Sequence, residues 1–141
     1  MQAVPGRSKG IQSMHKSRLA AFVLDSQVDD IQHATDFWSQ ALGYRPLPSD
    51  PDWAERYAYL DNPETEPRLL LQKVAHPSHI HLDIETDNIQ AEVERLCKLG
   101  AFIVKQMPRW TVMQAPSGHR FCVVMPQRAD FDQHPDVNIW P

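Results

Sequence analysis

The sequence contains no apolar run that approaches the roughly 20 residues needed to cross a bilayer. Its amino terminus is basic but lacks the apolar core of a secretory signal. There is also no surplus of positive charge, since 14 basic residues stand against 18 acidic ones. Nucleic-acid binding usually requires a concentrated basic surface. We therefore expect a cytoplasmic protein that binds neither nucleic acid nor membrane.

The sequence has few cysteines and no nucleotide-binding motif. The chain has no glycine-rich phosphate loop and no dinucleotide-binding fingerprint. Its two cysteines, Cys97 and Cys122, fall on a predicted helix and a predicted strand, which favours buried free thiols over a disulfide. The 141 residues, 42% hydrophobic and 23% charged, fit one ordinary globular domain.

The hydrophobic pattern predicts the same order of elements twice. We expect a flexible leader at 1–17, one domain at 18–126 with halves of about 18–75 and 78–126, and a polar C-terminal tail at 127–141. In the first half the pattern predicts a strand at 19–24, a helix from about 30 to 43, and strands at 56–60 and 68–74. In the second half it predicts a strand at 79–85, a helix from about 87 to 100, and strands at 101–105, 110–114 and 120–125.

The two predicted helices share their start and stop signals. Asp29 or Asp30 is expected to cap the first helix and Asp87 the second, and Gly43 and Gly100 end them. Such a repeat usually means two like units that together bury one core. The fold class that we expect is therefore α+β, with two strand-helix-strands modules.

Five groups of residues, in a fixed order, carry a family resemblance: Asp36-Phe37-Trp38 with Ala41-Leu42-Gly43, Leu71-Gln72-Lys73-Val74, His81-Leu82-Asp83-Ile84, Ala91-Glu92-Val93-Glu94-Arg95-Leu96 with Leu99-Gly100-Ala101, and Trp110-Thr111-Val112-Met113 with Phe121-Cys122-Val123. In this order they resemble the glyoxalase-like domain of the vicinal oxygen chelate superfamily (glyoxalase, bleomycin resistance and dioxygenase proteins) from about Leu19 to Val124. The resemblance implies two βαβββ modules whose curved sheets form a cup, and homodimers are common in the superfamily. Lyase, isomerase, dioxygenase and drug-binding members use that cup, so the fold does not choose the reaction.

Metal-dependent members of the superfamily place four ligands in the cup, two from each half. His81 matches one of these positions, whereas its first-half counterpart falls at Ala20, within one residue, and has no donor atom. Gln72 and Cys122 stand at the other two positions, where Cys122 replaces the usual carboxylate. We therefore expect an incomplete metal quartet and assign no cofactor. A divalent metal held by His81 and unmatched donors remains an alternative.

Other residues could carry chemistry in the cup. His81, Asp83 and Glu85 alternate on one strand and could form an acid–base set, unless Glu85 lies in water at the strand end. Cys122 with His81 could form a nucleophile pair.

Further histidines and tryptophans have simpler interpretations. His79 shares a strand face with His81, the direction of His76 is open, and we expect His15 and His119 at the surface. Trp38 is expected in the core because it lies in the apolar stripe of the first helix. The residues expected to line the pocket are Trp53, Gln72, His81, Trp110 and Cys122.

We therefore expect a glyoxalase-like protein with a small-molecule pocket, an unidentified substrate and an incomplete family metal set. One alternative is a metal-dependent lyase or dioxygenase that uses His81. The other is a non-catalytic small-molecule or drug-binding protein. A homodimer is expected in each case.

Overall fold

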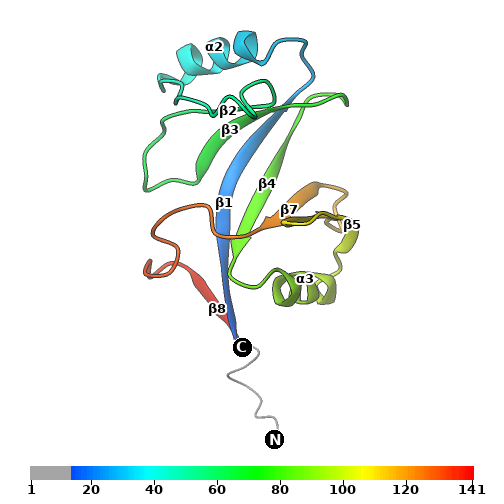
Figure 1. The fold of residues 1–141 in the computed structure, drawn as a ribbon. Coiled ribbons are helices and arrows are strands. Elements are labelled where there is room, and N and C mark those ends of the chain that lie inside the picture. Colours follow the sequence, from blue (N-terminus) through cyan, green and yellow to red (C-terminus); the bar gives the residue numbers. More distant parts are fainter. Residues whose placement is uncertain (1–13) are drawn as a thin grey trace, which may run out of the picture. The chain divides into compact units, whose positions relative to one another are not determined.

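The computed structural model describes residues 14–141, which form two compact units (Figure 1). We call residues 21–82 the first-half unit, and residues 14–20 with 83–141 the second-half unit. Two strands, β1 (His15–Ser26) and β4 (His79–Thr86), contribute residues to both units. Of the leader expected from the sequence, residues 1–13 lie outside the described residues, and residues 15–17 belong to β1.

The first-half unit is built on a small sheet. Its strand order is β2 (Tyr57–Tyr59), β3 (Arg68–Lys73) and the carboxyl-terminal part of β1. β3 runs parallel to β1, in a register that pairs residues 68–73 with residues 21–26, and β2 runs antiparallel to β3. A parallel pair needs a long crossover connection. Helix α2 (Ile31–Leu42) lies in that connection.

Local signals set the limits of α2. The carboxylate of Asp30 accepts a hydrogen bond from the Gln32 backbone N–H at 2.9 Å and caps the first turn. At the other end Gly43 adopts a left-handed conformation with φ of 77° and donates its N–H to the Ser39 carbonyl. Both signals were predicted, and of the two expected caps, Asp29 and Asp30, the structure uses Asp30.

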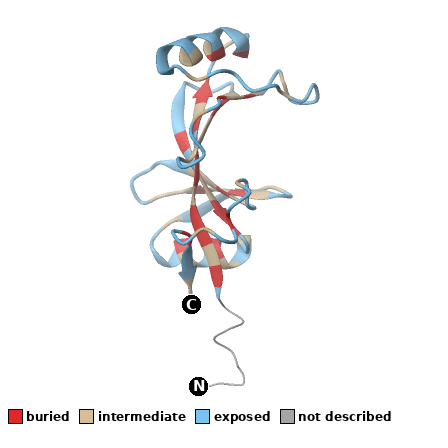
Figure 2. Ribbon diagram, turned by 90° about the vertical axis from the view of Figure 1, so that its left-hand side faces the viewer, coloured by how far each residue is buried: buried red, intermediate tan, exposed pale blue. Residues whose placement is uncertain are grey.

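One side of α2 packs on the sheet. A buried cluster of Ile31, Ala58, Leu60 and Leu71 forms the core, and Trp38 packs against it, as the helical stripe predicts. The remaining residues of α2 are mostly exposed, and their part of the ribbon is pale blue in Figure 2.

Because Leu71 points toward the helix, the next residue of the same strand must project from the opposite face. Gln72 is that residue, and its register partner in β1 is Asp25. Gln72 and Asp25 thus lie on the sheet face that α2 does not cover.

The second-half unit repeats the order of elements. It contains the end of β4, α3 (Ile89–Lys98), β5 (Phe102–Gln106), β6 (Trp110–Gln114) and β7 (Arg120–Val124), with strand order β7-β6-β5. Its core is formed by Val93, Leu96, Met113 and Val123. The cap of α3 differs from the prediction. Asn88 accepts from the Ala91 N–H at 3.0 Å, whereas the expected cap, Asp87, binds the Lys16 N–H instead.

The segment expected to be a polar tail is part of the second-half unit. Strand β8 (Asn138–Trp140) pairs antiparallel with the first residues of β1. Phe131 is only 2% exposed. A three-residue strand and one isolated aromatic give almost no periodic signal, which explains why the sequence pattern did not reveal them.

Three side chains lie in environments that the sequence interpretation had wrong. His15 was expected at the surface but is buried, and its Nε2 lies 2.8 Å from the Glu92 carboxylate. Both cysteines are free, but Cys97 is exposed and Cys122 is partly exposed rather than buried. Cys97 lies on a one-sided helix, where a shift of one position separates the buried face from the exposed face.

Candidate functional site

A buried carboxylate at the end of β1 is the centre of the candidate site. Asp25 is 5% exposed, and its Oδ2 lies 2.6 Å from Nδ1 of His81 and 3.1 Å from Nε2 of His79. Its other oxygen, Oδ1, is buried and has no hydrogen-bond partner among residues 14–141. A buried polar atom without a partner costs about 1–3 kcal/mol. Such an atom marks a place where a further ligand would be stabilised.

The contact with Asp25 fixes the orientation of His81, which is itself 9% exposed. An ionised carboxylate can only accept hydrogen bonds, so Nδ1 of His81 must be the donor in this contact. In the neutral imidazole Nε2 then carries the lone pair. Asp25 therefore selects the tautomer in which Nε2 of His81 can take up a proton.

Two neutral polar side chains continue this face of the sheet. Gln72 is the register partner of Asp25 across β1 and β3, and Tyr57 is the register partner of Gln72 across β3 and β2. The amide Nε2 of Gln72 donates to the Tyr57 hydroxyl at 3.3 Å. Paired residues of adjacent strands point to the same face of a sheet. Asp25, Gln72 and Tyr57 thus form one polar row that crosses three strands.

A second group of donors lies at the start of β4. The rings of His76 and His79 stack with their centroids 4.6 Å apart and their planes within 10°. Asp25, His76 and His79 each offer one ligand atom, and these three atoms lie within 4.8 Å of one another. Both histidines are exposed, whereas the carboxylate is buried.

The five residues predicted to line a pocket are divided between the units. Gln72 and His81 lie in the first-half unit as described, and Trp53 is an exposed residue of a turn there. Trp110 begins β6, and Cys122 lies in β7, where it pairs with Val112. The nucleophile pair of Cys122 and His81 would join two units, so it stays a prediction.

Glu85 does not belong to an acid–base set, as one interpretation of the sequence held, nor does it lie in water, as the other held. It is fully buried, and its carboxylate accepts from the guanidinium groups of Arg18 at 2.7 Å and Arg128 at 3.1 Å. The backbone N–H groups of Gln127 and Arg128 add contacts at 2.6 and 3.0 Å. Burial alone would raise the pKa of Glu85, but these donors hold its pKa below the ordinary value.

The residues present do not fit the metal quartet that the resemblance implies. Ala20, at the first position, is fully buried and has no donor atom. His81 uses Nδ1 to bind Asp25, and Gln72 uses its amide nitrogen to bind Tyr57. Cys122 offers a thiol where a carboxylate is expected. The oxygen donor that the sequence analysis missed is Asp25, whose only signal was an acidic residue directly after an apolar strand.

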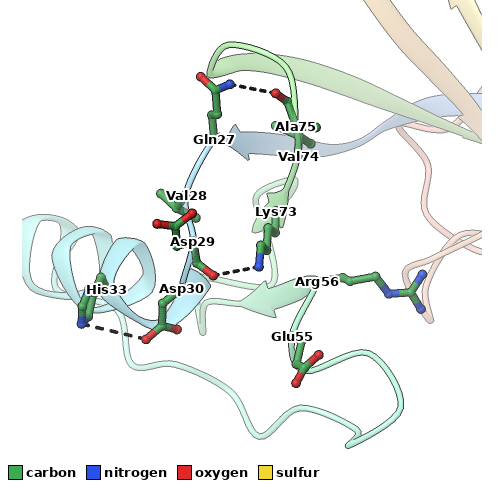
Figure 3. Close-up of a pocket in the computed structure, with 10 residues that line it drawn as sticks. All are labelled: Gln27, Val28, Asp29, Asp30, His33, Glu55, Arg56, Lys73, Val74 and Ala75. Carbon is green, nitrogen blue, oxygen red and sulfur yellow. Dashed lines mark hydrogen bonds and ion pairs between the residues drawn. The ribbon is translucent and has the colours of Figure 1, made fainter.

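A cleft of about 980 Å³ lies at the edge of the first-half unit (Figure 3). It is lined by residues that follow β1, begin α2, precede β2 or lie at the end of β3: Gln27, Val28, Asp29, Asp30, His33, Glu55, Arg56, Lys73, Val74 and Ala75. Lys73 closes one side of it by donating to the Asp29 carbonyl at 2.7 Å. None of the five predicted pocket residues lines this cleft, so a pocket around them stays a prediction.

Comparison with known proteins gives the family of this chain. The model of the glyoxalase-like domain matches residues 21–124. A search of the curated proteins gives no match. Among solved structures, the chain is similar to methylmalonyl-CoA epimerase from Mycobacterium tuberculosis, with 16% identity and a TM-score of 0.58 over 77% of this chain and 87% of that one.

Two further solved structures are similar. A glyoxalase/bleomycin resistance protein/dioxygenase superfamily member from Vibrio splendidus 12B01 has 16% identity and a TM-score of 0.50, over 78% of this chain and 99% of that one. Homoprotocatechuate 2,3-dioxygenase from B. fuscum has 16% identity and a TM-score of 0.51, over 82% of this chain and 35% of that one. The predicted α+β fold is thereby confirmed. The chain belongs to the glyoxalase-like domain family, with the fold of the vicinal oxygen chelate superfamily.

Proposed function

We propose that this protein is an enzyme that moves a proton on a small molecule, with His81 as the proton-transfer group and Asp25 as its positioning residue. The contact of 2.6 Å between two buried side chains carries this proposal. A carboxylate that holds Nδ1 of an imidazole orients the ring and stabilises the imidazolium that forms when Nε2 takes up a proton. A buried pair of this kind adds little to the stability of the fold, because the cost of desolvating the two groups offsets their attraction.

The substrate class that we propose is a small carbonyl compound with an acidic C–H bond. Removing such a proton develops negative charge on the carbonyl oxygen, which neutral hydrogen-bond donors stabilise. Gln72 and Tyr57 supply an amide and a phenol on the sheet face that carries Asp25. A base beside neutral donors is the combination that this reaction class requires.

The solved structures do not decide the reaction. Their names include an epimerase and a dioxygenase, and at 16% identity they share the fold alone with this chain. The alternatives of a metal-dependent lyase or dioxygenase and of a non-catalytic binding protein therefore have to be separated by experiment.

Hydrogen–deuterium exchange tests proton transfer without a known product. The protein is incubated in D₂O with a panel of small carbonyl compounds, including α-keto acids, aldehydes and acyl thioesters, and loss of the C–H signal is followed by proton NMR. We expect exchange of at least one compound, reduced about 100- to 10,000-fold in His81→Gln. His33→Gln, which changes an exposed histidine on α2, should exchange at the wild-type rate.

Asp25→Asn tests the positioning role. It should slow exchange more than about tenfold and also change the ¹⁵N shifts of His81 toward the other tautomer, an effect that a merely structural role would not produce. The absence of exchange across the panel, or equal rates in wild type and His81→Gln, would refute the proposed function.

We also propose a homodimer in the cytoplasm. β5 pairs with only one strand, β6, among the described elements and exposes Phe102, Ile103 and Val104, and an exposed apolar edge strand is a common pairing surface. The two free thiols fit a reducing compartment. None of the helices in residues 14–141 is long and apolar enough to cross a membrane.

A further inference from the structure

We infer that Asp25, His76 and His79 form a binding site for a divalent transition-metal ion of the zinc class. This site uses none of the four positions at which the family resemblance places metal ligands. His76 lies in the connection between β3 and β4, His79 begins β4, and Asp25 lies at the end of β1. Their three ligand atoms lie within 4.8 Å of one another.

His76 is already arranged as a ligand, and His79 becomes one when an ion replaces its Nε2 proton. His76 directs Nδ1 to the Pro77 carbonyl at 2.9 Å. A carbonyl only accepts, so Nδ1 carries the proton and Nε2 has the lone pair that a metal requires. His79 points Nε2 at Asp25 Oδ2, 3.1 Å away, where the carboxylate accepts its proton, so a bound ion would displace that proton and lie between the two groups. A backbone carbonyl on the far nitrogen is a common partner of a metal-ligating histidine.

The buried carboxylate is the second, independent observation. Asp25 is 5% exposed, and its Oδ1 has no hydrogen-bond partner in the described part of the chain. His81 and His79 both approach Oδ2, which leaves the charge on Oδ1 without a counterpart there. A divalent ion bound by the carboxylate and the exposed imidazoles would supply that counterpart.

The donor set selects the kind of ion. Two imidazole nitrogens and one carboxylate oxygen suit Zn²⁺, Co²⁺, Ni²⁺ or Fe²⁺, whereas Mg²⁺ and Ca²⁺ require mostly oxygen ligands. Metal–ligand bonds of about 2.0–2.2 Å require the ligand atoms to lie closer together than 4.8 Å. His76 and His79 are exposed and can rotate, so only surface side chains need to move. Three protein ligands leave at least one position for water or a small molecule.

Isothermal titration of the full-length, tag-free and chelator-treated protein tests the site. We expect one Zn²⁺ per chain with a Kd of about 1 µM or tighter, and no heat with Mg²⁺. His76→Gln and His79→Gln should each weaken binding more than about tenfold, and Asp25→Asn should do the same. His33→Gln is the control, because His33 is also an exposed histidine of the same unit and lies 3.9 Å from a carboxylate, that of Asp30.

Two comparisons make the outcome decisive. His81→Gln should weaken Zn²⁺ binding less than His76→Gln does, although it slows hydrogen–deuterium exchange about 100- to 10,000-fold, which separates this site from the proposed proton transfer. Co²⁺ titration should give a visible d–d absorption band that His76→Gln loses. If Asp25→Asn does not fold by circular dichroism, the two exposed histidine variants decide the question.

The inference fails if the protein binds Zn²⁺ more weakly than about 1 mM. It also fails if His33→Gln weakens binding as much as His76→Gln, which would indicate an adventitious ion only. Loss of binding in His81→Gln with retention in His76→Gln would place the ion elsewhere and overturn the assignment.

Discussion

Replacing Glu85 should destabilise the fold strongly, because its carboxylate joins three segments of the second-half unit. Arg18 donates from β1, and Arg128 and the Gln127 backbone donate from the segment after β7. Arg18 also binds Asp130 at 2.6 Å, and Arg128 binds the Leu19 carbonyl at 2.6 Å. The carboxylate is thus the shared acceptor of a network that holds the carboxyl-terminal segment on β1.

The magnitude follows from what the substitution leaves behind. Glu85→Ala removes the carboxylate from two guanidinium groups whose side chains are 8% and 14% exposed. Breaking a buried ion pair by removing one partner costs about 3–5 kcal/mol. Glu85→Gln keeps the size and one acceptor oxygen, so we expect a loss of about 1–3 kcal/mol. Either value is a large part of the about 5–15 kcal/mol that stabilises a typical domain.

Urea unfolding at pH 7, followed by circular dichroism, measures both losses. Glu94→Gln, an exposed glutamate of α3, is the matched control and should change the free energy of unfolding by less than about 0.5 kcal/mol. A loss below about 1 kcal/mol in Glu85→Ala would refute the assignment of a structural role to this carboxylate. The same variant should leave hydrogen–deuterium exchange at the wild-type rate wherever the protein remains folded.

Three further outcomes are expected. Burial alone would raise the pKa values of Glu85 and Glu92, but their hydrogen bonds lower both. The stability that these two carboxylates add is therefore complete above the ordinary carboxyl pKa of about 4.3 and is lost as the pH falls through the lower folded values. Urea unfolding between pH 7 and pH 3 should show this loss, and a loss of stability from these groups on raising the pH from 5 to 7 would contradict it. Gly43→Ala should cost about 1 kcal/mol in thermal unfolding, because φ is 77° while no atom crowds the new methyl group, and an unchanged Tm would show that the turn tolerates a side chain. Ile103→Lys should convert the proposed dimer to a monomer in light scattering, whereas a wild-type monomer would rule out the homodimer.

The local structure could be predicted because its signals are local. The apolar stripe and an aspartate cap at Asp29 or Asp30 gave α2, and the hydrophobic pattern gave β6 with the observed bounds. The cap of the second helix was assigned one residue early, at Asp87 rather than Asn88. Asp87 and Asn88 are adjacent and either side chain could cap the helix. The carboxylate of Asp87 accepts from the Lys16 N–H instead, a contact that only the tertiary structure shows.

The candidate site was only half visible in the sequence. His81 and Gln72 were identified through the family resemblance, but Asp25 was not, although it contacts His81 directly. Glu85 was considered for catalysis, yet it holds Arg18 and Arg128 in the second-half unit. Charged residues alternate along many strands, and the sequence does not say which of them meet a partner.

The sequence by itself determined the repeated order of elements, the positions of the helices and the family, because periodicity, caps and motif order depend on neighbours along the chain. Tertiary structure alone decided that Asp25 meets His79 and His81, residues more than 50 positions away in the chain. That contact depends on how β1 lies beside β4, and a slip of one residue would turn these side chains to the other face. The chemistry of the site is therefore set by strand register, which local sequence patterns do not encode.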